Sequence, residues 1–183
     1  MKKNGFSLAE VLITIAIVGA VASLAIPALI TKTTRQSMAS KLSSTVSDVE
    51  NGIGSMMVDE DKENFYETPF GVSRSSLSSL KKYLNYSEST TGLAGFYGTN
   101  SPFSELGGTA DSGNYSEYTT IKLRNGAIAS FSSGSGMFID VNGEESPNKW
   151  GRDVFDFTIN NEGSLLPAGN STTLVKNNYR VNY

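Results

Sequence analysis

The chain has 183 residues, a length that allows one ordinary domain and one additional segment. Its formal net charge is −3, so there is no basic excess for binding a nucleic-acid backbone. It contains neither cysteine nor histidine, which excludes disulfides, thiolate nucleophiles and the usual zinc ligands, and leaves oxygen ligands suited to Ca²⁺ or Mg²⁺.

The N-terminal part of the chain is divided sharply by polarity. Residues 1–5 form a short basic segment with two lysines, and residues 6–30 are apolar apart from Glu10. Within them, Val11–Ile30 is a run of twenty uncharged residues. At about 1.5 Å per residue, a helix of this length spans a hydrocarbon core of roughly 30 Å. The lysines predict a cytoplasmic N-terminus, so residues 31–183 are expected to be exported.

A cleaved secretory signal peptide is the alternative interpretation of this run. The tripeptide Ala20-Val21-Ala22 resembles the cleavage site of such a peptide. However, the apolar run is longer than the core of a usual signal peptide, and a carboxylate lies near its start. Both features favour a segment that remains in the protein as a membrane anchor.

The helical pattern continues beyond the apolar run. Over residues 31–58, apolar residues recur at spacings of three and four with polar residues between them, which predicts an amphipathic helix. We therefore expect one helix from Phe6 to near Val58, kinked at Pro27. The apolar positions are Met38, Leu42, Val46, Val49, Ile53 and Met56 or Met57. Their stripe needs a partner surface.

The following segment, residues 59–116, is expected to hold variable loops. A short helix is expected at about Ser76–Asn85, where three leucines share one face. The stretch Thr90–Asn114 is rich in glycine and has few apolar pairs, so it is expected to be a long surface loop.

Residues 117–183 predict an antiparallel sheet. The dipeptide Asn125-Gly126, which lies between two runs of strand-forming residues, is the strongest short signal of a hairpin. The expected strands are Tyr118–Leu123, Ala127–Phe131, Met137–Val141, Asp153–Asn160 and Ser164–Leu166. Because these four or five strands can cover the apolar stripe of the long helix, the sequence predicts an α+β fold.

The string Gly5-Phe6-Ser7-Leu8-Ala9-Glu10 places a small residue, a phenylalanine and a glutamate at the head of an apolar helix. It resembles the leader of type IV pilins and of the pseudopilins of type II secretion. The resemblance implies a pilin-like fold, cleavage of the Gly5–Phe6 bond by a prepilin peptidase, and methylation of the new Phe6 amine by the same peptidase/N-methyltransferase. Such cleavage removes the basic leader and keeps the apolar segment.

Glu10 is the most informative single residue of this string. An ionised carboxylate in a membrane helix costs about 2.5 to 3.5 kcal/mol, so such a residue normally has a partner. The resemblance implies that Glu10 pairs with the N-terminal amine of a neighbouring subunit; the alternative is a carboxylate solvated at the headgroup level. Gly19 and Pro27 are either tolerated helix breakers or, as in assembled filaments of this family, the limits of a stretch where the helix loosens.

Residues 140–153 combine turn formers and oxygen ligands between two expected strands. The segment resembles one found in pilin-like proteins of bacterial secretion systems, and Asp140, Asn142 and Asp153 resemble ligands of a structural Ca²⁺ such as that of major pseudopilins. The spacing matches only the start of an EF-hand pattern. The alternative is an Asx-type turn, in which these side chains bond to the backbone.

These features predict a structural subunit, not an enzyme, of a type II secretion pseudopilus or a type IV pilus-like filament. Its expected partners are other pilin-like subunits and the membrane platform of the assembly machine. Its expected location is the bacterial cytoplasmic (inner) membrane, crossed once, with the C-terminal domain outside. The alternative is a membrane-anchored tip or minor pilin that binds an exported substrate or DNA, although the acidic balance argues against DNA.

Overall fold

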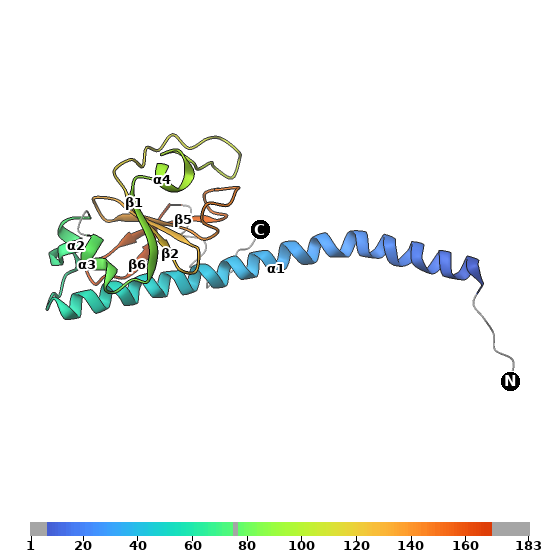
Figure 1. Cartoon of the computed structure of the whole chain (residues 1–183), viewed down its shortest axis with the longest axis horizontal. Helices are drawn as coiled ribbons and strands as arrows, with labels where there is room; N and C mark the ends of the chain where they lie inside the picture. The colour runs from blue at the N-terminus through green and yellow to red at the C-terminus, as the bar shows by residue number, and fades with distance from the viewer. Residues whose placement is uncertain (1–6, 75–76, 170–183) are drawn as a thin grey trace. The chain divides into compact units, whose positions relative to one another are not determined.

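The computed structural model of the chain describes residues 7–74 and 77–169. The described part holds four α-helices, one short 3₁₀ helix and six strands, labelled in chain order. They are α1 (Leu8–Asp59), η1 (Phe65–Glu67), α2 (Pro69–Val72), α3 (Leu77–Lys81), β1 (Tyr86–Thr91), α4 (Ala94–Tyr97), β2 (Thr119–Leu123), β3 (Ile128–Phe131), β4 (Gly136–Asp140), β5 (Val154–Ile159) and β6 (Leu165–Pro167). Figure 1 shows these elements in colours that follow the chain.

The chain divides into two compact units, residues 1–37 and 38–183, and each is described by itself. The described residues of the first unit belong almost entirely to α1, and their apolar side chains are exposed, as for Leu24 at 79% and Val18 at 66%. An 18-residue window near the N-terminus of α1 has a mean hydropathy of 2.4, and none of that window is buried. Length and composition therefore allow α1 to cross a membrane.

The second unit is built on the remaining part of α1, which packs against the sheet through one stripe. The predicted stripe is confirmed, because each of its residues from Leu42 to Met56 is at most 3% exposed and Met38 packs against them. The facing side chains come from alternate strand positions, which point to the same face of a sheet. They include Ile121, Ala129, Phe131, Ile139, Phe155, Phe157 and Ile159.

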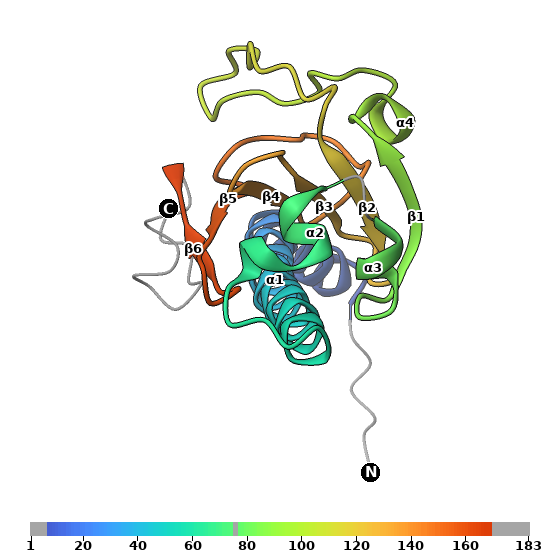
Figure 2. The same cartoon turned by 90° about the vertical axis from the view of Figure 1, so that its left-hand side faces the viewer.

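The six strands form one antiparallel sheet in which every strand pairs with the next one in sequence. Figure 2 shows this sheet curving around the second part of α1. The predicted hairpin joins β2 to β3, with the Gly126 N–H donating to the Leu123 carbonyl at 2.9 Å. Gly126 has a φ of 82°, a left-handed conformation that favours glycine.

The α+β fold class is confirmed, but the sheet has one strand more than expected. The additional strand is β1, which lies at the edge of the sheet in a region expected to be helix and loop. Most of its residues are exposed, so its sequence lacks the alternation of apolar and polar residues that marks a half-buried strand. Pairing with β2 over Thr119–Leu123 defines it instead.

The connection between α1 and β1 is more ordered than the sequence suggested. The expected helix near Ser76–Asn85 is reduced to the five residues of α3, while η1 and α2 were not predicted. Thr68 caps α2 by accepting a hydrogen bond from the Gly71 N–H at 3.0 Å, and Pro69 follows at a position where helices tolerate proline. Both helical turns bury a phenylalanine completely, Phe65 in η1 and Phe70 in α2.

A second apolar cluster, here called the outer cluster, covers the sheet face opposite α1. Its buried members are Leu93, Phe103, Phe138, Trp150 and Val154, with Tyr97, Tyr115 and Tyr118 packed against them. Asp111 accepts hydrogen bonds from the Tyr115 hydroxyl and, at 3.0 Å, from the Trp150 indole N–H. The stretch expected to be a surface loop is therefore fastened to the sheet by aromatic packing.

Two glycines of α1 give a matched test of this packing. A methyl group at Gly52 would overlap Leu84 Cδ2 and lie 3.2 Å from the Tyr83 carbonyl, whereas a methyl group at Gly54 has no neighbour within 4 Å. Gly54→Ala should therefore raise the free energy of unfolding by about 0.5–1 kcal/mol through helix propensity alone. Gly52→Ala should lower it, because overpacking costs about 1–3 kcal/mol.

The measurement is denaturant unfolding of the full chain in detergent, with both variants compared to wild type. Equal stabilisation by the two substitutions would show that Leu84 is not seated against α1.

Candidate functional site

The start of α1 forms a reciprocal capping arrangement between Ser7 and Glu10. The Glu10 carboxylate accepts a hydrogen bond from the Ser7 N–H at 2.8 Å, and the Ser7 hydroxyl accepts one from the Glu10 N–H at 3.3 Å. This is the capping box that a serine and a glutamate three residues apart can form. It satisfies two of the backbone N–H groups that a helix N-terminus leaves without partners. Gly5 and Phe6, the predicted processing residues, lie outside the described residues.

The helix continues without interruption through Gly19 and Pro27. The Thr31 hydroxyl donates to the Pro27 carbonyl at 2.9 Å, and the Ser23 hydroxyl donates to the Ala20 carbonyl at 2.8 Å. Such side-chain bonds help a membrane helix to tolerate a proline, which lacks a backbone N–H. The proposed kink at Pro27 and the loosening between Gly19 and Pro27 stay predictions.

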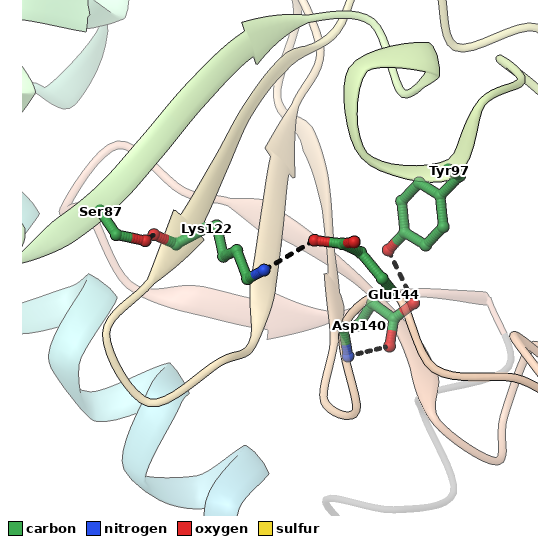
Figure 3. A network of polar contacts seen from close by, with 6 residues as sticks. Ser87, Tyr97, Lys122, Asp140 and Glu144 are labelled. Atoms are coloured by element: carbon green, nitrogen blue, oxygen red, sulfur yellow. Dashed lines mark hydrogen bonds and ion pairs between the residues drawn. The ribbon is translucent and has the colours of Figure 1, made fainter.

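The second candidate site is the loop that follows β4, residues 140–153, here called the acidic loop. Asp140 ends β4 and is fully buried. One of its carboxylate oxygens accepts from the Gly143 N–H at 3.1 Å, and the other accepts from the Tyr97 hydroxyl at 2.8 Å. Figure 3 shows Tyr97 reaching this carboxylate from α4. The loop is thus attached to a segment more than forty residues earlier in the chain.

The other two predicted ligands also bond within the acidic loop. The Asp153 carboxylate is fully buried and accepts from the backbone N–H groups of Asn148 at 3.0 Å and Lys149 at 2.7 Å. The Asn142 amide donates to the Glu145 carbonyl at 2.6 Å. The Asx-type turn weighed as an alternative is therefore present, because all three side chains bond to the loop backbone.

The electrostatics of the acidic loop reflect two carboxylates that are removed from water. Burial raises the pKa of Asp140 to about 8, and the nearby Asp153 raises it further, while the hydrogen bond from Tyr97 opposes the rise. Burial also raises the pKa of Asp153. Lys41 of α1 lies near enough for Asp140 and Glu145 to oppose the lowering of its pKa by burial. Two buried carboxylates favour either a proton or a cation between them.

Two orphaned oxygens provide a test of whether the acidic loop fits a calcium ion. Among the described residues, the buried side-chain oxygens of Asn142 and Asn148 find no hydrogen-bond partner. Buried polar atoms rarely lack a partner, and amide oxygens are ligands that Ca²⁺ accepts. The described residues contain no group of three or more Asp, Glu, His or Cys side chains placed to hold a metal, so an ion here would depend on the amide oxygens. On this chemistry the residues fit calcium, with Asn148 as a donor that sequence reasoning missed.

The acidic loop is also fastened to the edge of the sheet. The Lys122 ammonium of β2 lies 2.6 Å from the Glu144 carboxylate, and the Ser87 hydroxyl of β1 donates to the Lys122 carbonyl at 3.1 Å (Figure 3). Both charged side chains are partly exposed, so their ion pair contributes little stability by itself. Its effect is to orient the loop relative to β1 and β2.

Residues 1–26 match the family model of the prokaryotic N-terminal methylation motif. This motif is the prepilin-type cleavage and methylation signal of type IV pilins and pseudopilins, so the resemblance inferred from the N-terminal residues is confirmed. The motif implies processing by a prepilin peptidase and assembly with other pilin subunits, and it marks a family of structural subunits. No curated protein and no solved structure matches the chain.

The outer cluster contains one carboxylate whose ionisation should be visible in stability measurements. Burial raises the pKa of Asp156 to about 6, and Asp111 and Glu105 raise it further. Because the folded domain holds this proton more tightly than the unfolded chain, whose aspartate has a pKa near 3.9, the contribution to stability is present below about pH 4. It is lost as the pH rises to about 6.

We therefore expect the melting temperature to fall between about pH 4 and pH 6 because of this residue, and Asp156→Asn to flatten the profile over that range. Glu162→Gln, which removes an exposed carboxylate, serves as the control. A profile that keeps its slope in Asp156→Asn would assign the pH dependence to another group.

Proposed function

We propose that the chain is a structural subunit of a type II secretion pseudopilus or a type IV pilus-like filament. The observation that carries the proposal is the methylation motif over residues 1–26, placed at the head of a helix that can cross a membrane. In this proposal the leader is cut after Gly5, Phe6 is methylated on its new amine, and the subunit waits in the cytoplasmic membrane. Its exported domain begins after residue 30.

The exposed surface of α1 supports this role. Its large apolar side chains between Leu8 and Ile30 are 42% to 79% exposed and occur at successive helical positions, so they cover every side of the helix. A helix that is apolar all round belongs in a membrane or inside a larger apolar assembly. In the proposed function it occupies both in turn, first with lipid and then with neighbouring helices as its surroundings.

Glu10 is the proposed docking group. Its carboxylate costs about 2.5 to 3.5 kcal/mol in a membrane helix, and the bond from the Ser7 N–H compensates part of that cost. Cleavage after Gly5 creates an ammonium group on Phe6 of every subunit. An ion pair between the two groups of different subunits would release more energy away from water than it does in water.

Glu10→Gln separates the charge of this residue from its capping bond. Glutamine can still accept the hydrogen bond from the Ser7 N–H, so the helix start should be retained. The variant should be cleaved normally, remain in the membrane and fail to enter filaments, with at least a tenfold loss expected from the removal of a buried ion pair worth about 1.4 kcal/mol or more.

The measurement combines N-terminal mass spectrometry of the membrane fraction with quantification of sheared filaments. Thr14→Val, a neutral change in the same segment, is the control. Normal filament yield from Glu10→Gln would remove the carboxylate from the docking role, and a mature N-terminus other than Phe6 would contradict the proposed processing.

We further propose that the acidic loop binds a structural calcium ion through Asp140, Asn142 and Asp153, with the Asn148 amide oxygen as a fourth donor. The orphaned oxygens of the two asparagines support this assignment. The ion would neutralise two buried carboxylates and hold the loop in its turn conformation. No reaction is assigned to it.

Calcium should raise the melting temperature of the metal-free protein at neutral pH. Binding with the millimolar affinity of extracellular calcium modules would add about 2.7 kcal/mol at a hundredfold excess over Kd. Asn142→Ala removes one orphaned oxygen and should abolish most of the calcium-dependent increment, whereas Asn51→Ala, an exposed amide elsewhere, should keep it. An unchanged melting temperature with calcium, or an equal increment in Asn142→Ala, would reject the site.

A further inference from the structure

A polar groove runs beside the second part of α1, within the second unit. Its volume is about 440 Å³, which lies in the range of protein binding pockets. One wall is α1, another is the connection from α3 to β1, and the third is the β2–β3 hairpin. The lining residues are Asp48, Asn51, Gly52, Ser55, Tyr83, Leu84, Asn85, Leu123, Arg124 and Asn125. We call this feature the α1 groove.

The walls of the α1 groove are held to one another by direct bonds. The Asn125 amide of the hairpin donates to the Thr45 hydroxyl of α1 at 2.9 Å. The Arg124 N–H donates to the Asn85 carbonyl at 3.3 Å, which joins the hairpin to the β1 side. The close approach of Leu84 to Gly52 joins that side to α1. The groove is therefore formed before any partner arrives.

The rim of the α1 groove carries polar side chains without partners in the described part of the chain. Asp48 on α1 and Arg124 on the hairpin have opposite charges, and no ion pair or side-chain hydrogen bond joins either to another described residue. The amides of Asn51 and Asn85 likewise have no side-chain hydrogen bond among the described residues. The rim thus offers donors, acceptors and one charge of each sign, a set that matches a polypeptide surface better than a nucleic acid.

We infer that the α1 groove is the docking site for the exported domain of a second copy of this chain in the filament, which rests on the proposed function. The inference follows from continuity along one helix, because residues 48–55 of the wall and the proposed assembly segment belong to α1. When such helices pack together, the flanks of α1 in the exported domain face the adjacent copy. A groove on one copy and a different surface on the next make a heterologous contact, the kind that propagates into a filament.

The absence of cysteine in the sequence allows a clean crosslinking test in assembled filaments. Asn51→Cys, labelled with a thiol-reactive benzophenone, should yield on illumination an adduct that mass spectrometry identifies as two copies of the chain. Glu67→Cys, at an exposed position outside the groove, is the labelling control. The adduct should disappear when Glu10→Gln is added and assembly is blocked. Filaments without an adduct, or an adduct with a different protein, overturn the inference and leave the proposed function intact.

A charge exchange provides the second arm of the test. Asp48→Lys with Arg124→Glu keeps the net charge and inverts the pattern across the groove, so filament yield should fall at least tenfold. Lys62→Glu with Glu67→Lys is the matched exchange outside the groove and should leave the yield unchanged. Melting temperatures show whether each pair folds. Undiminished yield in the first exchange overturns the inference, whereas absence of filaments from the wild-type chain contradicts the proposed function instead.

Discussion

The structure depends on one constraint, which is that a single 52-residue helix must suit two surroundings. Up to about residue 30 its apolar side chains point in every direction, and only lipid or other apolar helices can cover them. From Met38 onward the apolar residues are confined to one stripe, and the sheet covers that stripe almost completely. The change of pattern along α1 therefore decides which part forms the core of a domain and which part stays available for assembly.

The sheet is arranged so that it does not compete with α1 as an assembly surface. A sheet edge with free backbone groups can pair with another chain, and natural proteins protect such edges. Here β6 has three residues and ends at Pro167, which has no N–H to donate. The other edge, β1, is irregular between Tyr86 and Glu88 and exposes polar side chains. With the outer cluster covering the remaining face, contacts through the helix and its flanks are favoured over contacts through the strands.

Local patterns in the sequence predicted the elements that local physics determines. The spacing of Met38 to Met56 gave the buried stripe, and Asn125-Gly126 gave the hairpin, because helical period and turn chemistry act within a few residues. The strand β1 was missed because pairing with a distant strand defines it. The partnership of Tyr97 with Asp140 and the role of Asn148 in the acidic loop were missed for the same reason. The Thr68-Pro69 cap of α2 was a readable signal that the sequence interpretation did not use.

The capping box explains how the subunit can carry Glu10 before it has a partner. A carboxylate that accepts a backbone N–H at the first turn of a helix gains from the helix dipole as well as from the bond, so the lone subunit has no unsatisfied charge. A hydrogen bond to a charged group contributes about 1.5–3 kcal/mol, and an ion pair surrounded by apolar helices contributes more only when its geometry is good. In the proposed function, docking is therefore an exchange of one satisfied state for another. Such an exchange favours correctly registered neighbours, because a misplaced ammonium offers less than the Ser7 N–H already provides.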